Sequence, residues 1–127
     1  MPKIQGILTV KSSEGQEKIP LKGIHHETVW TLHDDEAVKY RFEFQDQLLK
    51  YDKVSQESLQ FMFDVDKDTK AWYGIENRQI EFRVKTKDIV VDSHNLFVSY
   101  ELYQGETHLN SIKFSLECEL LEEEQND

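Results

Sequence analysis

The sequence has little material for covalent or metal-based stabilisation, because its 127 residues include one cysteine, Cys118, and two prolines. A single cysteine cannot close an internal disulfide and leaves no cysteine pair for a zinc site. No stretch reaches the ~18 consecutive apolar residues of a membrane-spanning helix, and the first residues contain no apolar run of signal-peptide length. These absences favour a cytoplasmic protein. Cys118 itself lies on the apolar phase of its segment, where a free thiol packs like a small hydrophobic side chain.

Positive charge is also scarce. There are 15 Lys and Arg residues and 25 Asp and Glu residues, so the formal net charge is −10. Such a field repels phosphate backbones and anionic lipid head groups, and we therefore expect neither nucleic acid nor a membrane surface as a partner. Apolar residues make up 38% of the chain, which is enough to bury about one face of each element in a single domain of this size.

Sequence motifs for catalysis and phosphate binding are absent as well. The sequence contains no Gly-x-Gly-x-x-Gly, no phosphate-binding loop and no nucleophile elbow. Carboxylates are abundant because acidic residues are abundant, and their spacing defines no triad. We therefore favour a protein without enzymatic activity and expect no cofactor, and an enzyme is the least favoured alternative.

The sequence does contain a clear alternation of apolar and polar residues with a period of two, which is typical of a strand with one buried face. The alternation is clearest from Ile112 to Leu120, where charged or hydroxylated residues separate the apolar ones. The segment from Arg78 to Leu120 contains four such runs, over residues 80–84, 89–91, 96–102 and 112–120. Because short polar breaks cannot carry a parallel crossover, these runs predict an antiparallel meander.

The N-terminal half continues the pattern, with strands expected over residues 4–11, 17–25, 27–32, 37–44, 59–65 and 70–73. Residues 45–58 are ambiguous: they fit one stripe of a short helix or a strand from Leu49 to Val54, and we favour the strand because it would pair with its strong neighbours. Gly6 and Gly23 indicate bends. Pro20 lacks an amide hydrogen, so it predicts an edge or bulge position.

Roughly nine or ten short strands without a long helix predict an all-β fold. We expect an antiparallel meander closed into a single lipocalin- or calycin-like β-barrel of roughly 8–10 strands over residues 1–120, because closure removes exposed strand edges. A sandwich is the alternative. The acidic segment 121–127 is expected to be a disordered tail.

Short motifs in the C-terminal half are similar to the end of the bacterial YwiB-like proteins. They are Thr86-Lys87 followed by Ile89, then Val98-Ser99-Tyr100-Glu101-Leu102, then His108-Leu109-Asn110 with Ile112. The resemblance is best from Gly74 to Glu117, whereas Leu59–Asp64 departs from the family's pattern of an arginine followed by a glycine. The resemblance implies a calycin- or lipocalin-like β-barrel. The family has no established activity, so the resemblance implies no catalytic residues.

Seven aromatic side chains fall on inward positions of the expected strands and are the candidate ligand-binding residues: Tyr40, Phe42, Phe61, Phe63, Phe82, Tyr100 and Phe114. They fit two interpretations, because a small barrel is just wide enough to fill with side chains or to hold one small ligand. In one, they line a pocket for a small apolar or amphipathic ligand, with Tyr40 and Tyr100 as polar handles. In the other, they pack as a solid core, and the protein binds a protein partner or a second copy of itself through its surface. An interior cavity on the order of several hundred Å³ would favour the ligand.

Metal sites are not expected. Asp64–Asp68 has acidic residues at alternate positions like an EF-hand, but the glycine and the last glutamate of that motif are missing from their positions. The adjacent His25 and His26 would point to opposite faces of a strand. His25, His33 and Asp35 could meet near one hairpin, although their spacing is not that of a zinc site.

Overall fold

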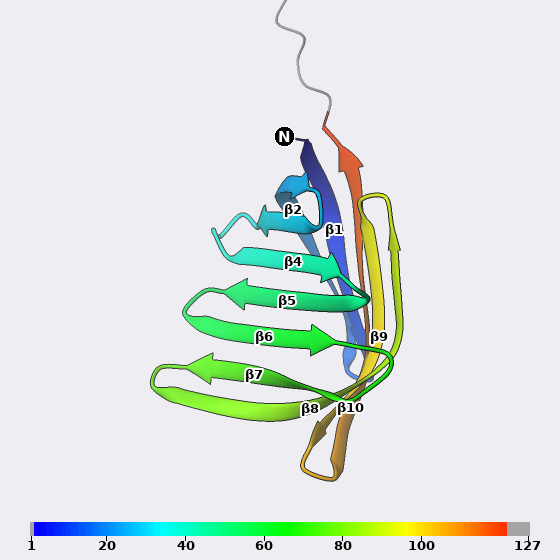
Figure 1. Cartoon of the computed structure of the whole chain (residues 1–127). Coiled ribbons are helices and arrows are strands. Elements are labelled where there is room, and N and C mark those ends of the chain that lie inside the picture. The colour runs from blue at the N-terminus through cyan, green and yellow to red at the C-terminus, as the bar shows by residue number, and fades with distance from the viewer. Residues whose placement is uncertain (1, 122–127) are drawn as a thin grey trace, which may run out of the picture.

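The computed structural model describes residues 2–121, which form ten antiparallel strands and no helix (Figure 1). The strands are β1 (Lys3–Ser12), β2 (Gly15–His26), β3 (Val29–His33), β4 (Lys39–Gln45), β5 (Leu48–Val54), β6 (Glu57–Phe63), β7 (Thr69–Ile75), β8 (Arg78–Asp92), β9 (Asn95–Gln104) and β10 (Thr107–Leu120). Each strand pairs with its neighbours in sequence, and β10 pairs with β1, so the meander closes into a barrel. The predicted all-β barrel is confirmed. Residues 122–127 of the expected tail lie outside the described residues.

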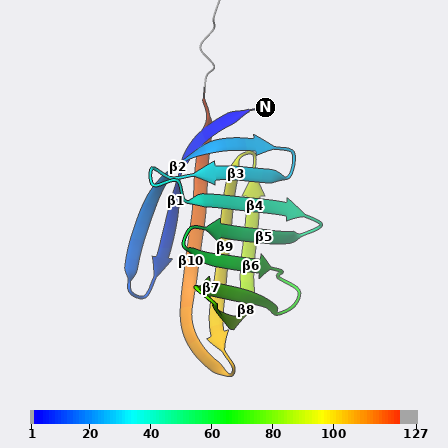
Figure 2. The ribbon, with the colours of Figure 1, turned by 90° about the vertical axis from the view of Figure 1, so that its left-hand side faces the viewer.

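The barrel is flattened into two layers whose strands cross. In both views β4, β5, β6 and β7 run nearly horizontally, whereas β9 and β10 run nearly vertically (Figures 1 and 2). The long strands β2 and β8 belong to both layers. Residues 15–24 of β2 pair with β1 and residues 22–26 pair with β3. Residues 78–84 of β8 pair with β7 and residues 83–92 pair with β9. These two strands therefore form the corners at which the sheet turns from one layer into the other.

The corner in β2 depends on a glycine. A Cβ atom on Gly23 would lie 2.0 Å from the carbonyl oxygen of Thr31, so only glycine allows β3 to approach this closely. Pro20 pairs with Ile7 of β1, while the pairing of β2 with β3 begins only at Lys22. On the side of β2 that faces away from β1, no described strand is paired at Pro20, so no hydrogen bond needs the amide hydrogen that proline lacks. The edge position predicted from the proline is confirmed.

The corner in β8 is a β-bulge, and here the prediction of four runs is wrong. Residues 78–92 form one strand, and the register with β9 shifts between Thr86 and Asp88. The extra residue moves the inward phase from even numbers, as at Val84, to odd numbers, as at Ile89. In the sequence this change of phase resembles a break between two strands. In residues 45–58, by contrast, the predicted strand is confirmed as β5, which ends at Val54, and β6 begins at Glu57, inside the predicted turn.

The interior is sealed at one end and partly exposed toward the other. Along β9 the inward side chains of Leu96 and Val98 are 2% and 0% exposed, Tyr100 is 8% exposed and Leu102 is only partly buried. On β1 the exposure likewise rises from Ile4 to Val10. We call the end of the interior near Ile4 and Leu96 the closed end, and the end near Val10 and Leu102 the open end.

Candidate functional site

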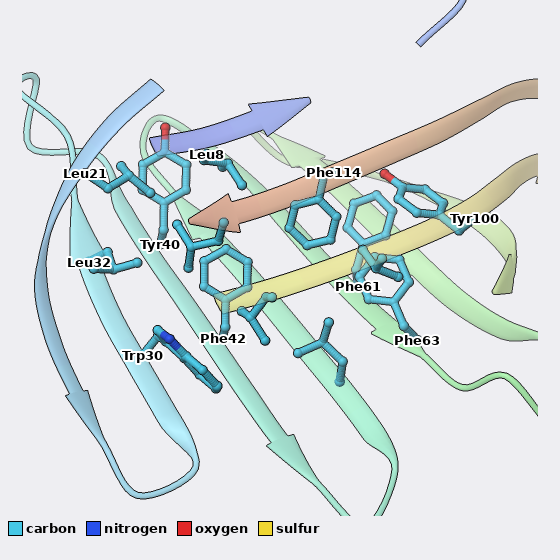
Figure 3. Close-up of a cluster of buried hydrophobic side chains, with 14 of the residues drawn as sticks. Leu8, Leu21, Trp30, Leu32, Tyr40, Phe42, Phe61, Phe63, Tyr100 and Phe114 are labelled. Carbon is cyan, nitrogen blue, oxygen red and sulfur yellow. The ribbon is translucent and has the colours of Figure 1, made fainter. Parts of the chain in front are cut away.

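Six of the seven candidate aromatic residues are buried, and Phe82 is partly buried against them. They are packed against one another across the two layers. The ring centroids of Phe63 and Tyr100 are 4.8 Å apart, and those of Phe42 and Phe114 are 5.8 Å apart. Figure 3 shows Phe61, Phe63, Phe114 and Tyr100 gathered together, with Phe42 beside them and Trp30 farther along the interior. The structure thus brings most of the candidate set into one aromatic cluster that occupies the middle of the barrel.

Tyr51 completes this cluster and was not among the candidates. Its ring stacks on Phe42 with centroids 4.7 Å apart and lies 5.6 Å from Phe114. Residues 45–58 carried the ambiguity between helix and strand, so their inward phase was not assigned. In the structure Tyr51 pairs with Phe42 on β4 and with Phe61 on β6, so its ring lies beside both. Knowledge of this pairing would have identified Tyr51.

The three tyrosine hydroxyls of the interior differ in their partners. The Tyr40 hydroxyl donates to Asp34 Oδ2 over 3.1 Å. Among residues 2–121 the Tyr51 and Tyr100 hydroxyls make no hydrogen bond, yet no fully buried side-chain polar atom of these residues lacks a partner. The two hydroxyls therefore have some accessible surface, and Tyr100 lies on β9 next to the partly buried Leu102 of the open end. Burial raises the pKa of both groups well above the usual value, so they are neutral hydrogen-bond donors at any physiological pH.

The histidines are not arranged as the sequence suggested. His25 stacks on the buried Trp30, with ring centroids 3.9 Å apart, and its Nδ1 lies 2.6 Å from Nδ1 of His94. His33 is exposed and pairs across the ladder with Lys22, so it does not meet His25. Within residues 2–121 no three His, Cys, Asp or Glu side chains are placed to hold one metal ion.

The largest hollow that we describe is a groove of about 900 Å³ on the outer face of the barrel, which we call the outer groove. A second, smaller pocket of about 230 Å³ lies near Lys11 and Ile112. Neither pocket is lined by any of the seven candidate aromatic residues. The outer groove is bounded by β1, β2, β10 and the β3–β4 connection, and its lining residues are Gln5, Gly6, Ile7, Thr9, Lys18, Pro20, Leu21, Lys22, His33, Asp34, Asp35, Ala37, Glu117, Cys118 and Glu119.

Strands β2 and β10 carry opposite charges on either side of an apolar floor, and the β3–β4 connection beyond β2 adds the carboxylates of Asp34 and Asp35. Ile7, which is 45% exposed, forms the floor on β1 and pairs with Pro20 of β2 on one side. Register places Gln5 between Lys22 of β2 and Glu119 of β10. Across two strand spacings, the backbones that carry Lys22 and Glu119 are about 10 Å apart. The basic wall thus lies on β2 and the acidic wall on β10.

Several charges of the outer groove have no ionic partner in the described part of the chain. Lys18, Lys22 and Glu117 form no ion pair with any residue from 2 to 121. Glu119 accepts one hydrogen bond from Gln5 Nε2, over 2.9 Å. These charged ends are accordingly available to a ligand in the groove.

Asp34 has a structural rather than a binding role in the β3–β4 connection. Its Oδ1 accepts from the amides of Glu36 and Val38 over 2.8 and 3.0 Å, while Oδ2 accepts from Tyr40. Burial opposes ionisation of the carboxyl group, but the two amides and the Tyr40 hydroxyl lower its pKa overall. The charged Asp34 therefore fixes the connection that forms one side of the outer groove.

Cys118 is not poised for nucleophilic chemistry. Burial raises the pKa of its thiol to about 11, so little thiolate exists at neutral pH. Its own backbone amide donates to Asn95 Oδ1 over 2.8 Å, which joins β10 to the start of β9. The thiol packs against the core as its apolar phase predicted.

The sequence contained indirect signs of the outer groove. Gly6 and Gly23 indicated bends in β1 and β2, and Pro20 indicated an edge or bulge position on β2. The alternating residues between the apolar ones, such as Lys18 and Glu117, would then line the outer face of the sheet. The register of the closing pair could not be inferred, because the pairing of β1 with β10 joins the two ends of the chain.

Comparison with known proteins agrees with this architecture. Residues 24–116 match the family model described as "Domain of unknown function (DUF1934)", which is more than half of the chain. The chain belongs to this family.

A similar solved structure is that of the ywiB protein from Bacillus subtilis, with a TM-score of 0.50 and 17% sequence identity, covering 95% of this chain and 92% of that one. At this identity the likeness supports the fold, and the resemblance to YwiB-like proteins is confirmed. The comparison with curated proteins gave no match. Among the described residues no helix is long and apolar enough to span a membrane.

Proposed function

We propose that this barrel is a binding protein that takes a short zwitterionic ligand, such as a peptide of about three residues with free ends, in the outer groove. The observation that carries the proposal is the pair of oppositely charged strands, whose backbones lie about 10 Å apart, a span that about three extended residues match. Lys18 and Lys22 would bind the carboxylate, and Glu117 with Glu119 would bind the ammonium group. The exposed Ile7 would contact the apolar middle of the ligand.

The composition of the interior supports placing the ligand outside. The aromatic cluster fills the middle of the barrel with contacting rings, whereas the outer groove provides about 900 Å³. This volume is in the range of small-molecule sites, about 300–1,000 Å³. Of the two alternatives weighed from the sequence, these observations favour recognition through the surface.

The test is a titration of the ¹⁵N-labelled protein with trialanine, followed by amide chemical shifts. We expect shifts confined to β1, β2, β10 and residues 33–37. The double substitution Lys18→Glu with Lys22→Glu should weaken binding at least tenfold. Trialanine acetylated at its N-terminus and amidated at its C-terminus should bind at least tenfold more weakly to the unaltered protein.

The matched control is Lys50→Glu, a charge reversal at an exposed position on β5 in the other layer. It should leave the affinity for trialanine unchanged. Equal weakening by Lys50→Glu, equal binding of the blocked peptide or an absence of shifts in the groove would contradict the proposal.

A second candidate function is the binding of a small amphipathic ligand at the open end, by the inward aromatic residues. Its support is the pair of Tyr51 and Tyr100 hydroxyls without partners in the described chain, beside partly buried apolar side chains such as Leu102 and Ile112. Such a ligand would place its apolar part between the layers and accept hydrogen bonds from the hydroxyls.

Native mass spectrometry of protein purified from its own host, together with a titration with dodecanol, tests this candidate. A bound molecule that Ile112→Glu displaces and Lys18→Glu retains would support it. A bare protein that also fails to bind dodecanol would refute it.

A further inference from the structure

The closed end contains a pair of histidines that belongs to neither binding site. His25 occupies an inward position on β2, and His94 lies in the turn between β8 and β9. Their Nδ1 atoms are 2.6 Å apart, and the two rings are nearly perpendicular, at 88°. A contact this short between two nitrogens requires one proton between them.

The partners of the two rings determine which histidine supplies that proton. His25 Nε2 lies 3.1 Å from the carbonyl oxygen of Glu27, which can only accept, so this nitrogen carries a hydrogen. In neutral His25 the Nδ1 atom is then bare and accepts. The hydrogen between the rings therefore belongs to His94 Nδ1, and Nε2 of a neutral His94 is bare.

The histidine pair joins two layers around Trp30. The indole Nε1 of Trp30 donates to the carbonyl oxygen of His94 over 3.0 Å, and its ring is stacked on His25 at an angle of 10°. Trp30 is 2% exposed. The β8–β9 turn is thus fastened to β2 by the imidazole pair and to β3 by the indole, and Asn95 links it to β10.

The elements that adjoin this contact carry further ionisable groups. From β2 and its turn come His26 and Glu27, which lie 3.9 Å apart, and from the end of β8 comes Asp92, which pairs with Asn95. Strand β10 carries Cys118, whose amide bonds to Asn95 next to His94, and β3 contributes the neutral indole of Trp30. The segment before β1 contributes the Pro2 carbonyl, which accepts from the His25 amide over 3.2 Å.

We propose that the bond between His25 and His94 is a proton-sensitive latch that keeps the β8–β9 turn closed over Trp30. One added proton still leaves a single hydrogen between the two rings, so the bond between them survives. A second proton can bind only at His25 Nδ1, where it would face the hydrogen on His94 Nδ1. The two donors then repel, and the turn separates from β2.

The direction of the pH dependence follows from the same surroundings. Burial first, and then the neighbouring His94, lower the pKa of His25 below its usual value of 6.5. The unfolded chain therefore takes up this proton at higher pH than the folded protein does. The stability from the latch is complete above about pH 6.5 and is lost as the pH falls below it.

Long-range ¹H–¹⁵N spectra of the imidazole nitrogens test the latch directly in the unaltered protein. At pH 8 we expect His25 with its hydrogen on Nε2 and His94 with its hydrogen on Nδ1. As the pH falls toward 4.5, the Trp30 indole resonance should shift together with His25, and its protection from exchange, corrected for the intrinsic rate, should fall at least tenfold.

Two variants separate the latch from general acid effects. In His94→Ala, the pH-dependent change at Trp30 should disappear, and protection should be low at every pH. His108→Gln, at an exposed position on β10, should behave like the unaltered protein. The opposite tautomers at pH 8, or a Trp30 resonance that stays constant while His25 titrates, would overturn the proposal.

Discussion

The two ends of the barrel interior differ in how their polar groups are satisfied. At the closed end, the imidazoles of His25 and His94 bond to each other, and the indole of Trp30 bonds to the backbone of His94. At the open end, the hydroxyls of Tyr51 and Tyr100 have no partner in the described chain and reach accessible space. Because unpaired polar groups cannot be buried cheaply, the closed end can exclude solvent and the open end stays accessible.

The largest loss of stability is expected when a ring is removed from the sealed interior rather than from its partly buried rim. Phe42→Ala removes a ring that is 0% exposed and contacts Tyr51 and Phe114, so we expect it to lower the free energy of unfolding by about 3–5 kcal/mol. Phe82→Ala, at a partly buried position, should lower it by clearly less. Urea denaturation of both variants measures the difference. Equal losses would remove the distinction between interior and rim.

The next effect concerns two glycines, of which only Gly23 lies beside the closed end. Gly23→Ala, at the corner beside the closed end, brings a Cβ against the fixed Thr31 backbone and should cost about 1–3 kcal/mol. Gly74→Ala on β7 meets the side-chain hydroxyl of Ser58 at 2.7 Å, which can rotate away, and the carbonyl oxygen of Arg78 at 3.7 Å, which is an ordinary contact. Gly23→Ala should therefore have a lower melting temperature than Gly74→Ala in thermal unfolding. The reverse order would contradict the account of the β2 corner.

A smaller loss is expected for the tyrosine whose hydroxyl is paired. Tyr40→Phe removes the donor to Asp34 Oδ2 and should reduce stability by about 0.5–1.5 kcal/mol. The loss should fade only as the pH falls well below 3.8, because the lowered pKa keeps the Asp34 carboxyl of the folded protein charged to lower pH. Chemical denaturation at a series of pH values from 7 to 2 measures the loss, and a loss that is constant over the whole series would argue against this bond.

The smallest effect is expected at the open end. Tyr100→Phe removes a hydroxyl that has no partner among the described residues, so the free energy of unfolding should change by less than about 0.5 kcal/mol. The same denaturation experiment at pH 7 applies, with Tyr40→Phe as the matched comparison. A loss as large as that of Tyr40→Phe would mean that the Tyr100 hydroxyl is satisfied within the protein.

Much of the fold could be predicted because strand alternation is a local property. The runs around Phe42, Val98 and Phe114 gave the correct inward phase before any pairing was known. The β-bulge between Thr86 and Asp88 could not be predicted in this way, because a change of phase within one strand resembles the boundary between two. Tyr51 was missed for a related reason, since its segment fitted a helix as well as a strand.

The candidate sites depend more strongly on pairing between distant strands. The aromatic cluster followed from inward phases alone, whereas the outer groove required the pairing of β1 with β10 and the bend of β2. The sequence could group His25 with His33 because they are near in the chain. The tertiary structure instead pairs His25 with His94, across 69 positions.

The sequence by itself determined the strands, their buried faces and the meander, because these depend on neighbouring residues and short connections. Only the tertiary structure decided which outer side chains share a groove, which histidines meet and which end of the interior is sealed. These features arise from contacts between residues far apart in the chain, and the positions of such contacts depend on barrel closure and on the two corner strands rather than on local alternation.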